Sequence, residues 1–502
     1  MRHLRSVALV LLAACGGYKS HSYAPTGGYV SSPAPYAIAA ADVQSGESYT
    51  DWGKNPWVDT SKDHLSTFAA DVDTASYTIA RRKLNEGTLP PKESVRVEEF
   101  VNYFTYSFAA PQPGSPFSVI MDAAPSPLGT GHHILRVGVA TKAKTQAERK
   151  PAHLVFLVDV SGSMGSADKI GLAQQSLRIL TENLGPQDSV SLVTYAGSTR
   201  VVLEPTGMED RDKIFTAIDQ LSAGGSTAMA SGLDLAYEQA MKGLMPGANA
   251  RVIVLSDGDA NVGPQGHEAH LRIIAERAKK GVTLSTIGFG MGNYKDSEME
   301  QLANKGNGNN YYIDSLSAAK KVFETQLGGT LEVVAKDVKL QVDFDPAIVS
   351  KYRLIGYENR NIADNDFRKD AVDAGEIGAG HQVTAMYELE LTPKGLAQNA
   401  GFGVVRIRHK APDGDAATEN AFPMTAQAAT SFDAAPADLR FAFAVAAFAD
   451  VLRGADEAKG WSLDKIANVA REASGDIAER TELVGLVEKA RALRGSPNTV
   501  AR

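Results

Sequence analysis

Cysteine is almost missing from this sequence, since Cys15 is the only one in 502 residues. A lone cysteine has no partner within the chain, so the fold cannot be cross-linked by intrachain disulfide bonds. A block of basic residues is missing as well: 51 Lys and Arg face 59 Asp and Glu, and the net charge is −8. This balance argues against nucleic acid as the main partner. Beyond the first fifteen residues no window approaches eighteen consecutive apolar residues, so no other segment is expected to span a bilayer.

The composition that is present suits a soluble globular protein, with 43% hydrophobic and 22% charged residues. A chain of this length is too long for one ordinary core. We therefore expect two to four structural units.

The first fourteen residues have the layout of a secretory signal: Arg2 and Arg5, then an apolar run, then small residues before Cys15. We expect a signal peptide over 1–14. The cut site resembles the lipobox of bacterial lipoproteins, which implies that Cys15 becomes a lipidated N-terminus that anchors the chain to a membrane. A plain cleaved signal is the alternative. Gly16 follows the cysteine where an Asp could stand, and resemblance to enterobacterial sorting implies outer-membrane delivery within a bacterial cell envelope, with the chain on the periplasmic or surface side.

Residues 15–60 are rich in Gly, Ser, Pro, Ala and Tyr and hold little bulky apolar surface. Such a segment cannot offset its ordering entropy, so it is interpreted as a flexible tether. A tether is what a lipid-anchored domain needs to stand clear of the membrane.

Residues 61–150 are expected to contain helices and strands, beginning with a helix over Ala75–Asn85 that Thr74 can cap. Asp71 and Asp73 superficially resemble a metal site. Acidic residues at the start of a helix are the favoured interpretation, because carboxylates stabilise its positive end.

Strand patterns with Gly, Pro and Asp turns occur on both sides of the chain's middle, over 116–141 and 331–432. We expect both flanks to contribute to one β-sandwich. His132 and His133 are adjacent in such a strand and point to opposite faces, so they are not expected to bind one ion. Residues 433–502 have helical periodicity and are expected to form a C-terminal helical region.

The middle of the chain, residues 151–330, alternates short apolar strands with amphipathic helices. The run 154–158 is continuously apolar, as in a strand buried on both faces. Repeated βα alternation of this kind predicts an α/β fold with a doubly wound, mostly parallel sheet.

Polar side chains follow the strands of this predicted sheet. Asp159, Ser161 and Ser163 leave the first strand, Thr227 stands in a Gly-rich loop before a helix, and Asp257 leaves a later strand. In a doubly wound sheet such segments meet at the carboxyl edge of the strands, so the five side chains are expected to converge there. Carboxylate and hydroxyl oxygens suit a hard divalent cation such as Mg²⁺. The alternative is that these residues are caps and turns without an ion.

With these five residues and their flanks (VDVSGSMG, GGSTAM, LSDGDANVG), the middle of the chain resembles a von Willebrand factor type A (VWA) domain with an intact metal-ion-dependent adhesion site. The resemblance implies that Ser161, Ser163 and Thr227 bind Mg²⁺ or Mn²⁺ through their hydroxyls. It implies that Asp159 and Asp257 act partly through waters. A partner's Asp or Glu carboxylate would complete the coordination.

The whole layout resembles bacterial lipoproteins that have a central VWA domain between an N-terminal VWA-associated region and a C-terminal uncharacterised region. Metal-dependent protein binding is therefore the expected function, and no catalytic residues are expected. A structural scaffold in an envelope complex is one alternative. A metal-dependent hydrolase is another, but the sequence has no GxxxxGK[ST] or GxSxG motif and no evident general base beside the site.

Overall fold

The computed structural model describes residues 46–127, 131–225, 229–258, 264–290, 292, 294–326, 329, 331–398, 401–424 and 428–495. The expected signal peptide over 1–14 and most of the expected tether over 15–60 lie outside these residues.

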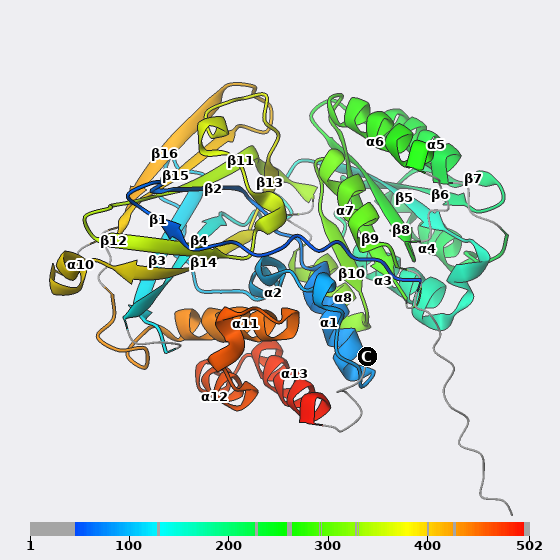
Figure 1. The fold of residues 1–502 in the computed structure, drawn as a ribbon. Coiled ribbons are helices and arrows are strands. Elements are labelled where there is room, and N and C mark those ends of the chain that lie inside the picture. The colour runs from blue at the N-terminus through cyan, green and yellow to red at the C-terminus, as the bar shows by residue number, and fades with distance from the viewer. Residues whose placement is uncertain are drawn as a thin grey trace, which may run out of the picture. The chain divides into compact units, whose positions relative to one another are not determined.

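The central domain is built on a six-stranded sheet in the order β10-β9-β8-β5-β6-β7 (Figure 1). All neighbouring strands are parallel except β6 and β7, which pair antiparallel at one edge. The expected doubly wound, mostly parallel sheet is confirmed. Its strands are β5 (Ala152–Asp159), β6 (Ser189–Tyr195), β7 (Thr199–Gly207), β8 (Asn249–Ser256), β9 (Val282–Phe289) and β10 (Asn310–Ile313).

The apolar run of β5 is continuous because both faces of the sheet are covered. Leu154, Phe156 and Val158 belong to the core on one face, whereas Val155 and Leu157 belong to the core on the other. All five side chains are fully buried.

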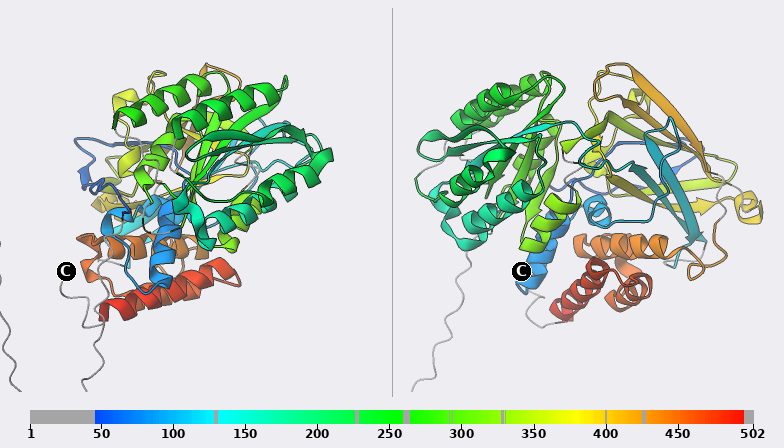
Figure 2. Two further views of the ribbon diagram at one scale, coloured as in Figure 1. Left: turned by 90° about the vertical axis from the view of Figure 1, so that its right-hand side faces the viewer. Right: turned by 180° about the vertical axis from the view of Figure 1, so that it is seen from behind.

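Helices cover both faces of this sheet, as the two views of Figure 2 show. Helices α3, α4 and α8 contribute to the first core, whereas α5, α6, α7 and α1 contribute to the second. The helices are α1 (Ala75–Asn85), α3 (Leu172–Glu182), α4 (Arg211–Asp219), α5 (Met229–Gly243), α6 (Pro264–Ala278), α7 (Asp296–Lys305) and α8 (Leu316–Lys320). The first helical turn before α3, Ala167–Gly171, is of the wider π type.

The expected β-sandwich is also confirmed, and its strands come from both flanks of the central domain. One sheet has the order β1-β12-β14-β4-β3, and the other has the order β13-β11-β15-β16 with β2 paired to β11. The first sheet contains β1 (Val58–Asp59), β3 (Phe117–Pro125), β4 (His132–Thr141), β12 (Val349–Ile355) and β14 (Gln382–Leu391). The second contains β2 (Leu65–Ala69), β11 (Val333–Phe344), β13 (Gly375–Gly378), β15 (Gly403–Lys410) and β16 (Ala417–Pro423), and a short helix α10 (Pro393–Gln398) follows β14.

Strands from the two flanks pair directly with each other. Leu135 of β4 lies opposite Tyr387 of β14, and Phe68 of β2 lies opposite Leu340 of β11, both in antiparallel ladders. These four side chains lie in one buried core between the sheets. The sandwich therefore cannot be assembled from either flank alone.

The C-terminal helices pack against the helices that precede the VWA domain. The largest core cluster joins α11 and α12 to α2, with Phe448 of α11 at 6.4 Å from Phe100 of α2 between ring centroids. This region contains α2 (Val97–Tyr103), α11 (Ala437–Arg453), α12 (Leu463–Ala473) and α13 (Ala478–Gly495). None of the helices in the described residues is long and apolar enough to cross a membrane.

The interpretation of Asp71 and Asp73 as helix-start residues is wrong. Both carboxylates pair with Arg360, at 3.2 and 3.1 Å, and Asp73 also accepts a hydrogen bond from the backbone N–H of Asn310. The two acids therefore hold together the N-terminal segment, the β-sandwich and the VWA domain. Their partner lies almost 290 residues away in the chain, which local spacing cannot reveal.

The start of α1 is satisfied in a different way from that expected. The side chain of Thr74 makes no capping hydrogen bond. Instead the carboxylate of Glu99, from α2, accepts a hydrogen bond from the backbone N–H of Ser76 at 2.8 Å. A carboxylate from a neighbouring helix thus meets the positive end of α1.

Candidate metal centre

The candidate site lies where the order of the central sheet reverses. The chain runs from β5 outward through β6 to the edge strand β7, and then returns to place β8 on the other side of β5. Open α/β sheets bind ligands at the carboxyl ends of the strands beside such a switch point. Asp159 is the last residue of β5, and Asp257 follows β8 directly.

The first loop presents a carboxylate and two hydroxyls. Asp159 is fully buried, and its Oδ1 accepts a hydrogen bond from the backbone N–H of Ser161 at 2.9 Å. The hydroxyl oxygens of Ser161 and Ser163 are 3.0 Å apart. Ser161 is buried whereas Ser163 is exposed, so this pair of oxygens lies at the boundary between the core and solvent.

The Gly-rich loop is fastened to the first loop by backbone hydrogen bonds. Gly224 donates to the carbonyl of Val160 at 2.7 Å, and Gly162 donates to the carbonyl of Gly225 at 3.0 Å. Gly225 has a φ of +95°, which L side chains rarely adopt. Thr227, two residues further on, lies outside the described residues. The structure therefore brings the beginning of its loop to the site and describes nothing of the threonine.

The third loop is joined to the first through Ser256. The Ser256 hydroxyl donates to Oδ2 of Asp159 at 3.0 Å and accepts a hydrogen bond from the backbone N–H of Gly258 at 3.0 Å. Asp257 is fully buried, and its Oδ2 accepts a hydrogen bond from Nζ of Lys169 at 2.9 Å. Asp159, Ser161, Ser163 and Asp257 are thus brought to one edge of the sheet.

The site contains the two buried carboxyl groups of Asp159 and Asp257 and one buried ammonium group, that of Lys169. Burial raises the pKa of the Asp159 carboxyl, and the nearby Asp257 carboxylate raises it further, although hydrogen bonds from Ser161 and Ser256 act in the opposite direction. Tyr195 is buried next to Asp159, and burial followed by the Asp159 charge raises the pKa of its phenol. Two buried carboxylates at one site repel each other unless a cation lies between or beside them.

These donors fit a divalent cation that prefers oxygen ligands. Two carboxylates and two hydroxyls are available among the described residues, and oxygen-only sets of this kind suit Mg²⁺ or Mn²⁺. The described residues contain no cluster of three or more His, Cys, Asp or Glu side chains arranged to hold a metal. A metal here would therefore depend on the serine hydroxyls as well as the carboxylates.

Lys169, Ser256 and Tyr195 belong to this site although they were not predicted from the sequence. Lys169 lies in the polar turn before α3, where a lysine is ordinarily a solvated residue, yet its side chain is only 9% exposed. The position of Ser256 beside Asp257 at the end of β8 was a usable signal for a residue that supports the site.

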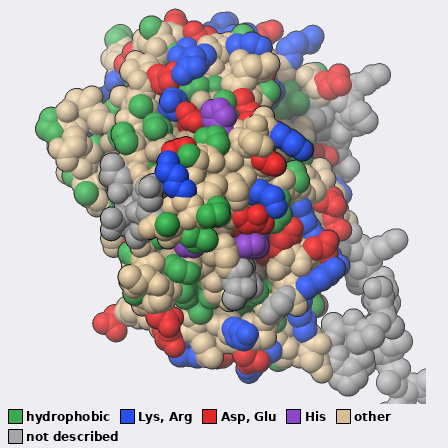
Figure 3. Space-filling view, turned by 60° about the vertical axis from the view of Figure 1, so that its left-hand side comes forward, with side chains coloured by type: hydrophobic (Ala, Val, Ile, Leu, Met, Phe, Trp, Pro, Cys, Tyr) green, Lys and Arg blue, Asp and Glu red, His purple; other side chains and the backbone are tan. Residues whose placement is uncertain are grey.

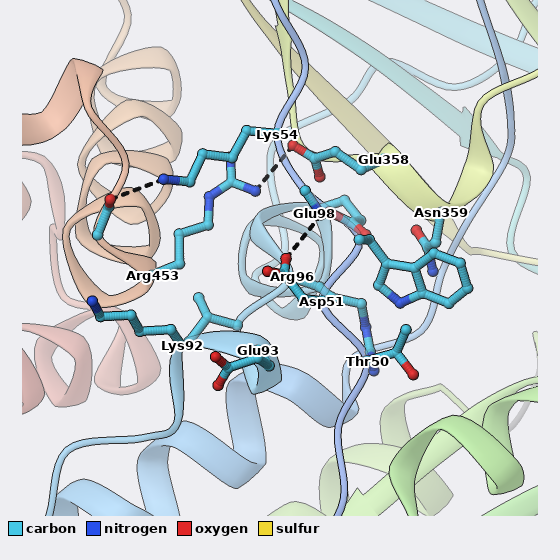
Figure 4. A pocket seen from close by; sticks show the side chains of 14 residues that line it. Thr50, Asp51, Lys54, Lys92, Glu93, Arg96, Glu98, Glu358, Asn359 and Arg453 are labelled. Carbon is cyan, nitrogen blue, oxygen red and sulfur yellow. Dashed lines mark hydrogen bonds and ion pairs between the residues drawn. The ribbon is translucent and has the colours of Figure 1, made fainter.

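A second polar cavity lies away from this edge, between α2, the loop at Glu358 and the end of α11 (Figure 4). Its volume is about 240 Å³. Lysines and arginines line it together with carboxylates, and Arg453 pairs with Glu358 at 3.0 Å. The charges of its walls are balanced, so the cavity does not select a ligand class.

Acidic and basic side chains are also interspersed over the face of the molecule drawn in Figure 3. The described residues on that face show no extended block of one sign. Cys15 lies outside the described residues.

Comparison with protein families assigns the three parts of the chain. Residues 153–325 match the von Willebrand factor type A domain, residues 43–136 match a second von Willebrand factor family, and residues 329–493 match the C-terminal region of the uncharacterized protein YfbK. These matches confirm the expected VWA domain with its two flanking regions.

Individual proteins are also similar to large parts of the chain. The "Uncharacterized protein YfbK" of Escherichia coli strain K12 is 38% identical over 468 residues, which span 88% of this chain and 80% of that protein. The "Uncharacterized protein sll0103" of Synechocystis is 25% identical over 60% of this chain and 72% of its own length. A solved von Willebrand factor type A protein from Catenulispora acidiphila covers 77% of this chain and 91% of its own, with 18% identity and a TM-score of 0.43. On the first of these similarities, the chain belongs to the family of the Escherichia coli protein YfbK.

Proposed function

We propose that this protein is a metal-dependent binding protein, which captures a protein partner through a divalent cation at the carboxyl edge of the VWA sheet. The proposal is supported chiefly by Asp159, which is fully buried and which hydrogen bonds connect to both the first and the third loop. Its neighbour Asp257 is equally buried. A cation offsets the repulsion between two such carboxylates.

Asp159, Ser161, Ser163, Thr227 and Asp257 would hold Mg²⁺ or Mn²⁺. When bound, the cation supplies an electrophilic centre that an Asp or Glu carboxylate of the partner can complete. The chain itself holds the hydroxyls of the buried Ser161 and the exposed Ser163 together at the boundary with solvent, and it keeps its two carboxylates buried. The role is one of binding and not of catalysis.

The N-terminal segment would connect the VWA domain to the membrane. Lipidation at Cys15 would anchor the chain in the cell envelope, in the outer membrane. The part of the expected tether that precedes Gly46 would act as the tether, because Gly46, Glu47 and strand β1 make contacts within the folded chain. Incorporation of a palmitate analogue into the full-length chain tests the lipidation, and it should be lost in Cys15→Ser. Incorporation that persists in that variant would contradict the anchor.

Capture of partners by the mature chain in Mg²⁺ and in chelator, followed by mass spectrometry, tests the binding role. The matched variant is Asp159→Ala, and the matched control is Asp219→Ala, an exposed acid on α4. A binding protein loses its Mg²⁺-dependent partner in Asp159→Ala and stays folded. A structural scaffold loses thermal stability alone, and a hydrolase loses turnover, so either result would contradict the proposal.

A further inference from the structure

Residues 46–55 form an extended segment, here called the strap, which is the dark blue trace entering the VWA sheet region in Figure 1. At one end the backbone N–H of Gly46 donates to the carbonyl of Gly292 at 2.6 Å. The carboxylate of Glu47 accepts hydrogen bonds from Arg82 at 2.8 Å and from the backbone N–H of Gly292 at 3.0 Å. Burial would raise the pKa of Glu47, but Arg82 and Lys83 lower it to about 2, so the carboxylate stays charged.

The contacts of the strap continue to Lys169 through Gly290. The carbonyl of Gly290 accepts hydrogen bonds from Arg82, at 2.7 Å, and from the hydroxyl of Tyr312. Gly290 has a φ of +73°, and a Cβ placed on it would lie 2.2 Å from Cγ of Lys169. The aliphatic part of Lys169 therefore lies directly against this glycine, which must lack a side chain for the contact to exist.

Beyond Gly290, the ammonium group of Lys169 reaches Asp257. Their side chains are 9% and 0% exposed and lie 2.9 Å apart. The structure thus gives one of the two buried carboxylates of the metal site an internal cation as partner. The path from Glu47 to Asp257 consists of packed and hydrogen-bonded groups throughout.

We propose that Lys169 is a built-in counterion of the metal-free site, and that the strap, acting through Arg82 and Gly290, keeps it there and so lowers the affinity for the divalent cation. This regulation rests on the metal site of the proposed function. A partner or a pulling force that lifts residues 46–49 from the VWA domain would raise the metal affinity.

The direction of the effect follows from charge. A divalent cation that enters a buried site next to an ammonium group is repelled by it, and this repulsion is much stronger than in water. Holding Lys169 on Asp257 therefore stabilises the metal-free state relative to the metal-bound state. The affinity for the divalent cation falls by the corresponding factor.

Titration calorimetry of the mature chain with Mg²⁺ and with Mn²⁺ tests the first step. Lys169→Met keeps an aliphatic side chain against Gly290 and removes the charge. It should bind the cation at least tenfold more tightly than the wild-type chain, yet melt at a lower temperature without metal. Lys169→Gln, which keeps a hydrogen-bond donor, should tighten binding in the same direction if the methionine variant fails to fold. Equal or weaker binding in a folded variant would overturn the proposal.

Glu47→Gln tests the second step, because an amide cannot form the ion pairs with Arg82 and Lys83. It should bind the cation severalfold more tightly than the wild-type chain, and it should have no such effect in a chain that already carries Lys169→Met. The matched control is Lys54→Met at the other end of the strap, where Nζ donates to the carbonyl of Gly454 at 2.9 Å (Figure 4). That control should leave the affinity unchanged.

The outcomes separate the two proposals. If the wild-type chain binds the metal and neither Lys169→Met nor Glu47→Gln binds it more tightly, the regulation is overturned and the metal site stands. Equal effects of Glu47→Gln in both backgrounds would show that the strap does not act through Lys169. Absence of binding in every variant, with no thermal shift, would overturn the metal site and the regulation together.

Discussion

The guanidinium group of Arg96 lies 2.6 Å from the carboxylate of Asp296, although 200 residues separate them. Arg96 precedes α2, whereas Asp296 begins α7 of the VWA domain. The same guanidinium contacts Glu99 and lies 3.5 Å from Glu300, and all four side chains are at most 5% exposed. One buried cation thus joins the N-terminal region to the VWA domain.

Arg96→Met should lower the free energy of unfolding by about 3–5 kcal/mol, because it removes the cation that pairs with the buried side chains of Asp296 and Glu99. Glu300 keeps Arg360 as its second partner, at 3.3 Å. Urea denaturation of the mature chain measures this. The control is Arg178→Met, whose partner Asp219 is half exposed and whose ion pair should contribute less than about 1 kcal/mol. Equal effects of the two substitutions would contradict a structural role of the buried cluster.

Stability should fall as the pH rises, owing in part to Glu98. Burial, followed by the charge of Glu358, raises its pKa from 4.5 to about 7. The folded chain therefore binds more protons than the unfolded chain between these two values, and the free energy of unfolding decreases across that window.

Glu98→Gln cannot ionise and should flatten this pH dependence between about pH 4.5 and 7, which denaturation at several pH values measures. Its amide oxygen can still accept the hydrogen bond from the backbone N–H of Tyr357. Glu182→Gln, at an exposed acid of α3, is the matched control and should leave the slope unchanged. A slope that persists in Glu98→Gln would assign the pH dependence to other groups.

Ser256→Ala should weaken Mg²⁺ binding by about tenfold, because the residues that orient metal ligands commonly have effects of this size. The substitution removes the hydroxyl that donates to Asp159 and accepts from Gly258. Calorimetry measures the affinity, and the exposed Ser222→Ala is the control. An unchanged affinity would show that Asp159 does not need this support.

Ser462→Ala should destabilise the chain by about 1 kcal/mol, the usual cost of a lost N-cap. The Ser462 hydroxyl accepts a hydrogen bond from the backbone N–H of Lys465 at the start of α12. Thermal or urea unfolding measures this loss. Ser462→Asp, which keeps a capping oxygen, should retain most of the stability, whereas equal losses would point to a different role for the residue.

The sequence pattern of single segments predicted the strands of the central sheet and the helices. The continuous apolar run of β5 and the βα alternation predicted the central sheet, because a strand covered on both faces has no polar side to show. The helix over Ala75–Asn85 has the expected bounds, although Thr74 does not cap it. The helices of the C-terminal region follow from 3.6-residue periodicity. The carboxyl ends of parallel strands share one edge, which places Asp159 and Asp257 together.

Long-range charge pairing could not be predicted in this way. Asp73 pairs with Arg360, and Glu99 meets the start of α1, but neither partner is defined by spacing along the chain. Lys169 has the sequence context of a solvated residue, yet it is buried against Gly290 and paired with Asp257. Charged residues are rarely buried without a partner, so each such pairing requires knowledge of the fold.

The interleaving of the β-sandwich has a consequence for the order in which the protein folds. All strands of the VWA sheet lie between residues 152 and 313. In the sandwich, by contrast, β2 pairs with β11 and β4 pairs with β14, and both partners come after the VWA domain in the chain. During synthesis from the N-terminus, the VWA sheet can form while β2 still lacks β11 and β4 still lacks β14. Closing such distant pairs is slow. The edges of β2 and β4 that later pair with β11 and β14 are therefore the segments that a chaperone would have the longest time to bind.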